Sequence, residues 1–145
     1  MFKHILIPTD GSDLSNIAVA NGVRFAKEIG ARITGLTVTQ PFHYVAVEAM
    51  PIGDTQEQYD ADMQLVAERH LSTLKTAAAQ AGVSTELLHA SSDHPYEEIV
   101  KTAELQGCDV IFLASHGRRG MRAVLMGSET TKVLTHTRIP VVVYR

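Results

Sequence analysis

One stretch of the sequence, from Ala114 to Ser128, gathers residues that suit the binding of a phosphate group. Its glycines are Gly117, Gly120 and Gly127, and its arginines are Arg118, Arg119 and Arg122. Glycine lets backbone N–H groups approach an anion without side-chain obstruction, and arginine adds positive charge to a mildly acidic chain. A helix that begins at Gly127 and Ser128 would contribute the positive end of its dipole and a hydroxyl donor. These residues predict a phosphate-binding loop.

The same residues also allow a purely structural interpretation. The glycines could make turns, Ser128 could cap the following helix, and the arginines could keep an exposed loop soluble. From the residues alone, the two interpretations have equal support. The spacing does not fit a Walker loop, because the sequence contains neither Gly-Lys-Ser nor Gly-Lys-Thr. It therefore does not predict a hydroxyl that holds Mg²⁺.

Other residues that often do chemistry lack suitable partners in the sequence. No pair of histidines has the HxxxH spacing or the cysteine partner typical of a zinc site, so we expect no metal centre. Glu97 and Glu98 are adjacent and would point about 100° apart on a helix, unlike the facing carboxylates of an acid–base enzyme. Cys108 is the single cysteine, and we expect its thiol to be packed in the interior and unreactive. We predict no catalytic residue. The histidines are His4, His43, His70, His89, His94, His116 and His136.

Composition excludes several classes of protein. With 145 residues, of which 45% are hydrophobic and 20% charged, the chain matches one globular domain rather than a disordered chain. Its net charge of -3 provides no general positive field for nucleic acid or for an anionic membrane. No apolar stretch approaches the ~20 residues of a membrane span, and the N-terminus is too polar for a signal peptide. We expect a soluble, cytoplasmic, single-domain protein that binds neither nucleic acid nor membrane.

The scaffold for the loop can be predicted from apolar periodicity. Short apolar runs alternate with segments of helical spacing, which indicates an α/β fold with a parallel sheet and helices on both faces. The run from Val110 to Ala114 is apolar throughout and predicts a buried, central strand. The predicted strands cover residues 4–8, 33–38, 84–90, 110–114 and 141–144. The predicted helices run from Leu14 to Gly30, from Met63 to Gly82, from Pro95 to Gly107 and from Ser128 to His136, with a long loop between Thr39 and about Gln56.

In such a fold, ligands bind beyond the carboxyl ends of the strands, at the point where the strand order reverses. The loops after the first and fourth predicted strands are therefore the places to expect a site. The first of these loops holds Asp10, which by residue type favours a turn that caps the next helix. The second holds His116, which could donate a hydrogen bond to a phosphate but favours a structural use.

Together these segments resemble a universal stress protein of the UspA type, in the nucleotide-binding branch of that family. The likeness runs from Lys3-His4-Ile5-Leu6-Ile7-Pro8-Thr9-Asp10-Gly11-Ser12 to Pro140-Val141-Val142-Val143. The family's phosphate loop reads Gly, two residues, Gly, nine residues, Gly, then Ser or Thr. Gly117, Gly127 and Ser128 match its second half, whereas Ala114 stands at the first glycine. Alanine is excluded there only if the backbone needs a positive φ.

The resemblance implies a Rossmann-like, open five-stranded parallel sheet in the order 3-2-1-4-5, with the switch point between the first and fourth strands. It also implies that the chain binds ATP or a related adenine nucleotide, with or without Mg²⁺. The base and ribose would lie against Pro8, Thr9, Asp10 and Val38. The nucleotide-binding residues of the loop and the helix after it would be Ala114, His116, Gly117, Arg118, Arg119, Gly120, Gly127, Ser128, Glu129 and Thr130.

The function that the resemblance implies is that of a stress-response sensor or interaction module, with at most slow ATP hydrolysis. The last strand would form a sheet edge, and an exposed apolar edge is normally paired, which favours a homodimer through residues 140–144. Two alternatives stay open. One is a nucleotide-free dimeric interaction protein, which Ala114 favours. The other is an enzyme like the ATP pyrophosphatases, whose Ser-Gly-Gly-x-Asp-Ser loop is matched loosely by Asp10-Gly11-Ser12-Asp13.

Overall fold

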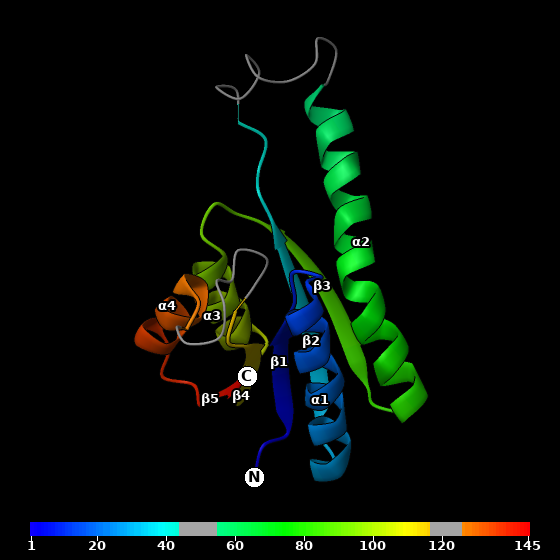
Figure 1. The fold of residues 1–145 in the computed structure, drawn as a ribbon, viewed down its shortest axis with the longest axis vertical. Coiled ribbons are helices and arrows are strands. Elements are labelled where there is room, and N and C mark those ends of the chain that lie inside the picture. Colours follow the sequence, from blue (N-terminus) through cyan, green and yellow to red (C-terminus); the bar gives the residue numbers. More distant parts are fainter. Residues whose placement is uncertain (44–54, 117–125) are drawn as a thin grey trace.

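The computed structural model describes residues 1–43, 55–116 and 126–145. Within these residues strands and helices alternate along the chain (Figure 1). Both the first and the last residue of every strand lie within one residue of the predicted position. The strands are β1 (His4–Pro8), β2 (Arg32–Thr39), β3 (Thr85–Ser91), β4 (Val110–Ala114) and β5 (Val141–Tyr144). The helices are α1 (Asp13–Ile29), α2 (Gln56–Ala81), α3 (Pro95–Leu105) and α4 (Ser128–His136).

The strands form one parallel sheet in the order β3-β2-β1-β4-β5, which confirms the expected α/β fold and strand order. The helices α1 and α2 pack on one face of the sheet, and α3 and α4 pack on the other (Figure 1). β4 lies inside the sheet as predicted, although β1 occupies its middle. β1 joins β2 through five residue pairs but joins β4 through two, Ile5–Val110 and Leu6–Ile111. Ladder pairs therefore do not hold the carboxyl ends of β1 and β4 together.

The core lies on both sides of the middle strands. Along β1, Ile5 and Ile7 are buried under α1 and α2, while Leu6 is buried under α3 and α4. β4 is buried at every position, as its unbroken apolar run predicts. Full burial of one such side chain contributes about 1.5–3 kcal/mol to folding. The loops that leave β1 and β4 are thus attached to the best-packed part of the fold.

The helix α2 begins at Gln56, about two turns before the predicted start. Its first residues are polar and mostly exposed, so apolar periodicity could not reveal them. The helix starts there because Thr55 and Gln58 form a capping box, in which each side chain bonds the backbone N–H of the other. This N-terminal part of α2 extends beyond the carboxyl ends of β2 and β3 (Figure 1).

The start of α4 corrects a second prediction. Gly127 occupies the N-cap position, and Ser128 is the first helical residue, so the prediction that Ser128 caps the helix is wrong. The chain turns into the helix at Gly127 because the Gly127 N–H donates to the carbonyl oxygen of Ser115 at 2.8 Å. The predicted ends of α1 and α2 are confirmed, since Gly30 and Gly82 cap them with positive φ. The helix α3 ends at Leu105, two residues before the predicted Gly107, although Gly107 has the expected positive φ. Among the described residues, none of the helices combines the length and the apolar character needed to cross a bilayer.

Candidate functional site

The turn between β1 and α1 is held by a compact set of hydrogen bonds. Thr9 Oγ1 accepts from the Gly11 N–H at 3.2 Å and from the Ser15 hydroxyl at 2.9 Å. Asp10 Oδ1 accepts from the Ser12 N–H at 3.0 Å, and Ser12 Oγ in turn caps α1 by accepting from the Ser15 N–H. Asp10 therefore does form the turn that its residue type favours. The same bonds fix the place of its carboxylate beyond the end of β1.

The helix α2 packs against this turn through His70. The His70 side chain is buried, and its Nδ1 lies 3.1 Å from the hydroxyl of Thr37 on β2. Gly11 has a φ of 74°, and a Cβ built on it would lie 2.5 Å from His70 Cδ2. His70 was among the histidines weighed for a metal and not among the predicted site residues. Its position three residues after Ala67 on the buried face of α2 is the signal that could have marked it as a packed residue.

Across the sheet, the two ends of the segment that follows β4 are held together. Besides the bond from Gly127 to Ser115, the Thr130 hydroxyl donates to the Ala114 carbonyl oxygen at 3.0 Å. A Cβ on Gly127 would lie 3.1 Å from the Ser115 carbonyl oxygen and 3.3 Å from His116 Cα. Both contacts are with backbone, which cannot move aside cheaply. A side chain at position 127 would therefore be crowded by the backbone of Ser115 and His116, which explains why glycine is found there.

His116 stands at the entrance to this segment. Its Nδ1 lies 2.9 Å from the Ser115 hydroxyl, and its Nε2 is buried without a hydrogen-bond partner in the part of the chain that the structure describes. If Nδ1 accepts from the hydroxyl, the ring proton sits on Nε2 and makes it a donor. A buried donor without a partner is costly, and an anion would satisfy it.

The remaining predicted site residues either make contacts elsewhere in the fold or lie outside the described residues. Glu129 is turned toward α3, where Oε2 accepts from the Tyr96 N–H at 3.0 Å and Oε1 lies 3.1 Å from Lys132 Nζ. Ala114 belongs to the core cluster beneath α1, and partly buried Val38 packs on the opposite face of the sheet. Gly117, Arg118, Arg119 and Gly120 lie outside the described residues.

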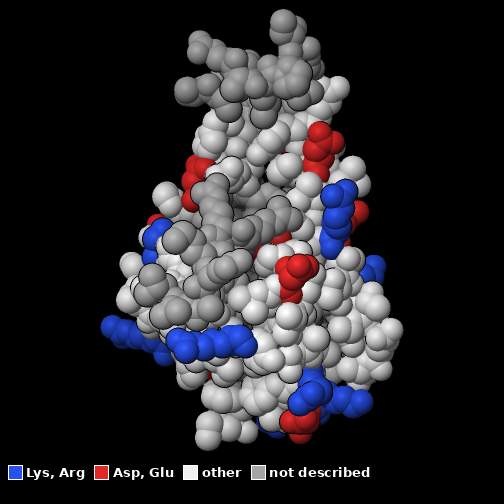
Figure 2. Space-filling model, viewed as in Figure 1, with Lys and Arg blue, Asp and Glu red and all other residues white. Residues whose placement is uncertain are grey.

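The charge on this face is mixed rather than concentrated. Figure 2 shows the described Lys and Arg residues in small groups that alternate with Asp and Glu, without a broad surface of either sign. Among the described residues, no three His, Cys, Asp or Glu side chains gather in a way that could hold a metal ion. The groups that the described residues offer around the ends of β1 and β4 are hydrogen-bonding backbone and side-chain atoms, among them the carboxylate of Asp10.

An open parallel sheet whose order reverses between β1 and β4 defines a doubly wound, Rossmann-like α/β protein, a class whose ligands usually bind at that switch point. Within this class, the chain belongs to the universal stress protein family, whose profile, described as "Universal stress protein family", matches residues 1–145. It is 30% identical to universal stress protein MJ0531 of Methanocaldococcus jannaschii, over 100% of this chain and 83% of that one.

Solved structures agree with this assignment. The structure of MJ0577, a universal stress protein of Methanocaldococcus jannaschii, superposes with a TM-score of 0.82 and 28% identity, covering 99% of this chain and 95% of that one. Two more distant structures share the fold and contain nucleotides. A universal stress protein in complex with cAMP has a TM-score of 0.69 and 19% identity, covering 99% of this chain and 97% of the other. The universal stress protein from Archaeoglobus fulgidus in complex with dAMP has a TM-score of 0.67 and 15% identity, covering 100% and 98%.

Proposed function

We propose that this chain binds an adenine nucleotide such as ATP at the switch point between β1 and β4. The observation that carries the proposal is the tight backbone approach at Gly127, where a Cβ would crowd Ser115 and His116. A glycine at the start of a helix, next to a His116 Nε2 that is buried and has no partner among the described residues, is an arrangement that suits an anion. The complexes of family members with cAMP and dAMP support an adenine nucleotide as the ligand.

The described residues suggest how the nucleotide would be held. The phosphates would meet the N-terminus of α4 at Gly127 and Ser128 and the Nε2 of His116. The base and ribose would lie against the β1–α1 turn at Pro8, Thr9 and Asp10 and against the end of β2 at Val38. Two predicted ligands are less suited, because Glu129 already bonds Tyr96 and the Thr130 hydroxyl already donates to Ala114.

We also propose that two copies of the chain associate through β5 and that the nucleotide tunes what this dimer contacts. β5 is an edge strand of four apolar or aromatic residues, each half-buried within the single chain. Unpaired apolar edges promote strand pairing, so a second copy is the simplest cover. In this proposal the protein acts as a sensor or interaction module, because the sequence lacks the Gly-Lys-Ser or Gly-Lys-Thr of a Walker loop, whose hydroxyl holds Mg²⁺ for phosphoryl transfer.

The test is a pair of substitutions at one position, Gly127→Ala and Gly127→Val, with ATP binding followed by calorimetry. Each added carbon pushes on the Ser115 carbonyl and the His116 backbone, so we expect affinity to fall in steps, by about tenfold or more for valine. Circular dichroism confirms that each variant is folded. If wild-type protein binds ATP no better than a folded Gly127→Val variant, the nucleotide proposal is wrong and the nucleotide-free interaction module takes its place.

A further inference from the structure

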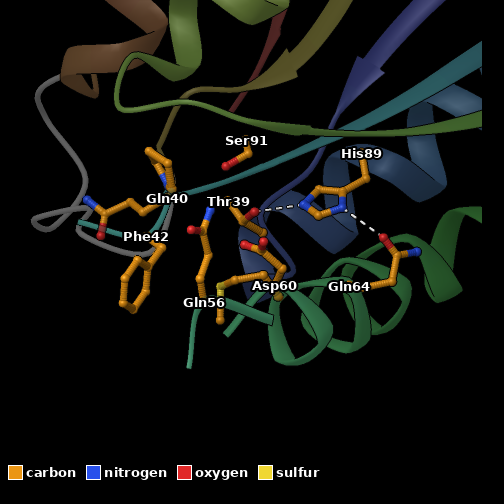
Figure 3. A pocket seen from close by; sticks show the side chains of 10 residues that line it. Thr39, Gln40, Phe42, Gln56, Asp60, Gln64, His89 and Ser91 are labelled. Carbon is orange, nitrogen blue, oxygen red and sulfur yellow. Dashed lines mark hydrogen bonds between the residues drawn. The ribbon is translucent and has the colours of Figure 1, made fainter. Parts of the chain in front are cut away.

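A cavity of about 440 Å³ lies at the carboxyl ends of β2 and β3, under the projecting N-terminal part of α2 (Figure 3). It is distinct from the proposed nucleotide site, since none of its lining residues belongs to the predicted nucleotide-binding set. Its volume is in the range of pockets that hold small organic ligands. The proposed nucleotide site does not use this cavity.

One wall of the cavity is a fixed chain of hydrogen bonds. His89 on β3 is bonded through both ring nitrogens, from Nε2 to the Thr39 hydroxyl at 2.7 Å and from Nδ1 to Gln64 Oε1 at 3.0 Å (Figure 3). The orientation of the Gln64 amide is set by Glu68, whose carboxylate accepts from its Nε2 at 3.3 Å. An amide oxygen can only accept, so His89 Nδ1 carries the proton. Burial lowers the pKa of His89, which keeps the ring neutral at pH 7.

The segment that follows β2 forms the opposite wall. Tyr59 on α2 donates its hydroxyl hydrogen to the Gln40 carbonyl oxygen at 2.8 Å, and its ring meets Phe42 edge-on at 5.5 Å between centroids. His43 Nε2 lies 2.7 Å from Asp93 Oδ1, which ties the same segment to the residues after β3. Hydrogen bonds with defined partners thus hold parts of both walls of the cavity in place.

The charge and polarity of the lining select a kind of ligand. Of the described residues that line the cavity, Asp60 is the one with a formal charge, and none is Lys or Arg. Asp60 and Gln56 point into the space between Phe42 and His89 (Figure 3). Met63 also lines the cavity and adds a polarizable apolar surface. A carboxylate and amide oxygens accept hydrogen bonds, so they favour a donor with positive charge and disfavour a phosphate.

We propose that this cavity is a second ligand site, which takes a small organic amine with a flat apolar body. The ammonium group would lie against Asp60 and Gln56, and the apolar body would pack on Phe42 and Met63. The proposal involves binding of the amine and no chemical reaction.

The experiment follows backbone amide signals by NMR while three probes of similar size and different charge are added: tryptamine, the neutral alcohol tryptophol and the anion indole-3-acetate. We expect tryptamine to give saturable shifts at Gln64 and His89, with the alcohol weaker by about threefold to fivefold and the acid weaker still. Saturating ATP should not displace tryptamine. Equal or tighter binding of indole-3-acetate, or saturable shifts confined to the β1–α1 turn, would overturn the proposal.

A matched pair of charge-neutralising variants separates a specific contact from general attraction. Asp60→Asn removes the carboxylate that lines the cavity, and Asp62→Asn removes an exposed carboxylate two residues along α2 that does not. We expect Asp60→Asn to weaken tryptamine binding by about fivefold and Asp62→Asn to leave it within about a factor of two. Equal losses in the two variants, or no saturable binding to the wild-type protein at millimolar tryptamine, would show that no amine site exists here.

Discussion

The imidazole of His70 lies so close to the backbone of Gly11 that a Cβ on Gly11 would stand 2.5 Å from His70 Cδ2. His70 also bonds Thr37 on β2, so one buried side chain joins α2, the second strand and the β1–α1 turn. The turn carries Asp10, whose carboxylate the nucleotide proposal places beside the ribose. The position of α2 is therefore linked to the geometry of the proposed nucleotide site.

Gly11→Ala should destabilise the protein by more than its backbone conformation alone explains. The positive φ costs roughly 1 kcal/mol for a residue with a side chain, and the contact with His70 adds about 1–3 kcal/mol of overpacking. Gly30→Ala is the matched control, because Gly30 has a φ of 66° and nothing within 4 Å of its added Cβ. Urea denaturation measures both variants. Equal losses of unfolding free energy would mean that His70 moves aside without cost.

Ala114→Gly should lower stability and leave ATP affinity unchanged. Ala114 pairs with Tyr144 in the sheet, and it packs in the core cluster beneath α1, so its methyl group fills core space. Loss of this methyl and the added backbone freedom of glycine should cost about 1 kcal/mol. Thermal melting and calorimetry with ATP check the two quantities separately. Tighter ATP binding by the glycine variant would show that the methyl crowds the phosphates instead.

Val143→Pro should convert the proposed dimer to monomers without unfolding it. The carbonyls of Pro140 and Tyr144 accept from the N–H groups of Ile111 and Ser115, so the alternation of a strand places Val142 toward β4 and Val143 toward the outer edge. Proline at 143 removes an outward donor, whereas Val142→Pro removes one that serves the sheet itself. Light scattering gives the mass of each variant. A dimer that survives Val143→Pro in folded form would place the interface elsewhere.

Stability should fall as the pH is lowered below about 6.5, in part because of His4. Burial lowers the pKa of His4 below its ordinary value of 6.5 and the Arg32 charge adds to this, while Asp109 and Glu86 partly oppose it. Below that pH the unfolded chain binds a proton that the folded chain excludes, so the unfolding free energy decreases. The His4→Gln variant should show a flatter pH dependence in chemical denaturation. An unchanged slope would assign the effect to other groups, among them His89.

Cys108 should resist alkylation in the folded protein. Its side chain is buried in the core cluster under α3, and burial raises the pKa of the thiol to about 11. The thiolate is the reactive form, so at pH 8 both access and ionisation disfavour reaction. Iodoacetamide labelling followed by mass spectrometry should be slow in buffer and fast in urea. Rapid labelling without denaturant would reveal local opening near the end of α3.

The fold could be predicted well because its signals are local. The apolar runs of β1 and β4 and the glycines that end the helices are readable one segment at a time. The first turns of α2 were missed because polar residues carry no apolar period, and a capping box at Thr55 starts the helix instead.

The candidate site was less readable because its contacts join distant segments. Glu129 directly follows the predicted phosphate loop in the sequence, yet its carboxylate bonds the backbone of Tyr96 on another helix. Nothing in the sequence around His70 predicts that it contacts the β1–α1 turn. His89 contacts Gln64 only because β3 and α2 lie side by side. Such partnerships are set by tertiary packing, which a single sequence does not display.

The neighbour of β1 on its other side, β4, comes late in the chain, and this affects how the sheet assembles on the ribosome. The strands β1, β2 and β3 and both helices of one face are complete once Ser91 has been made, whereas β4 begins at Val110. Because amino-terminal parts fold first during synthesis, a three-stranded half-sheet can form while β4 is still absent. Its β1 edge, with Ile5, Leu6 and Ile7, is then bare and prone to pair with other chains. We therefore expect mispairing of the nascent chain to be easiest in the interval before residues 110–114 emerge.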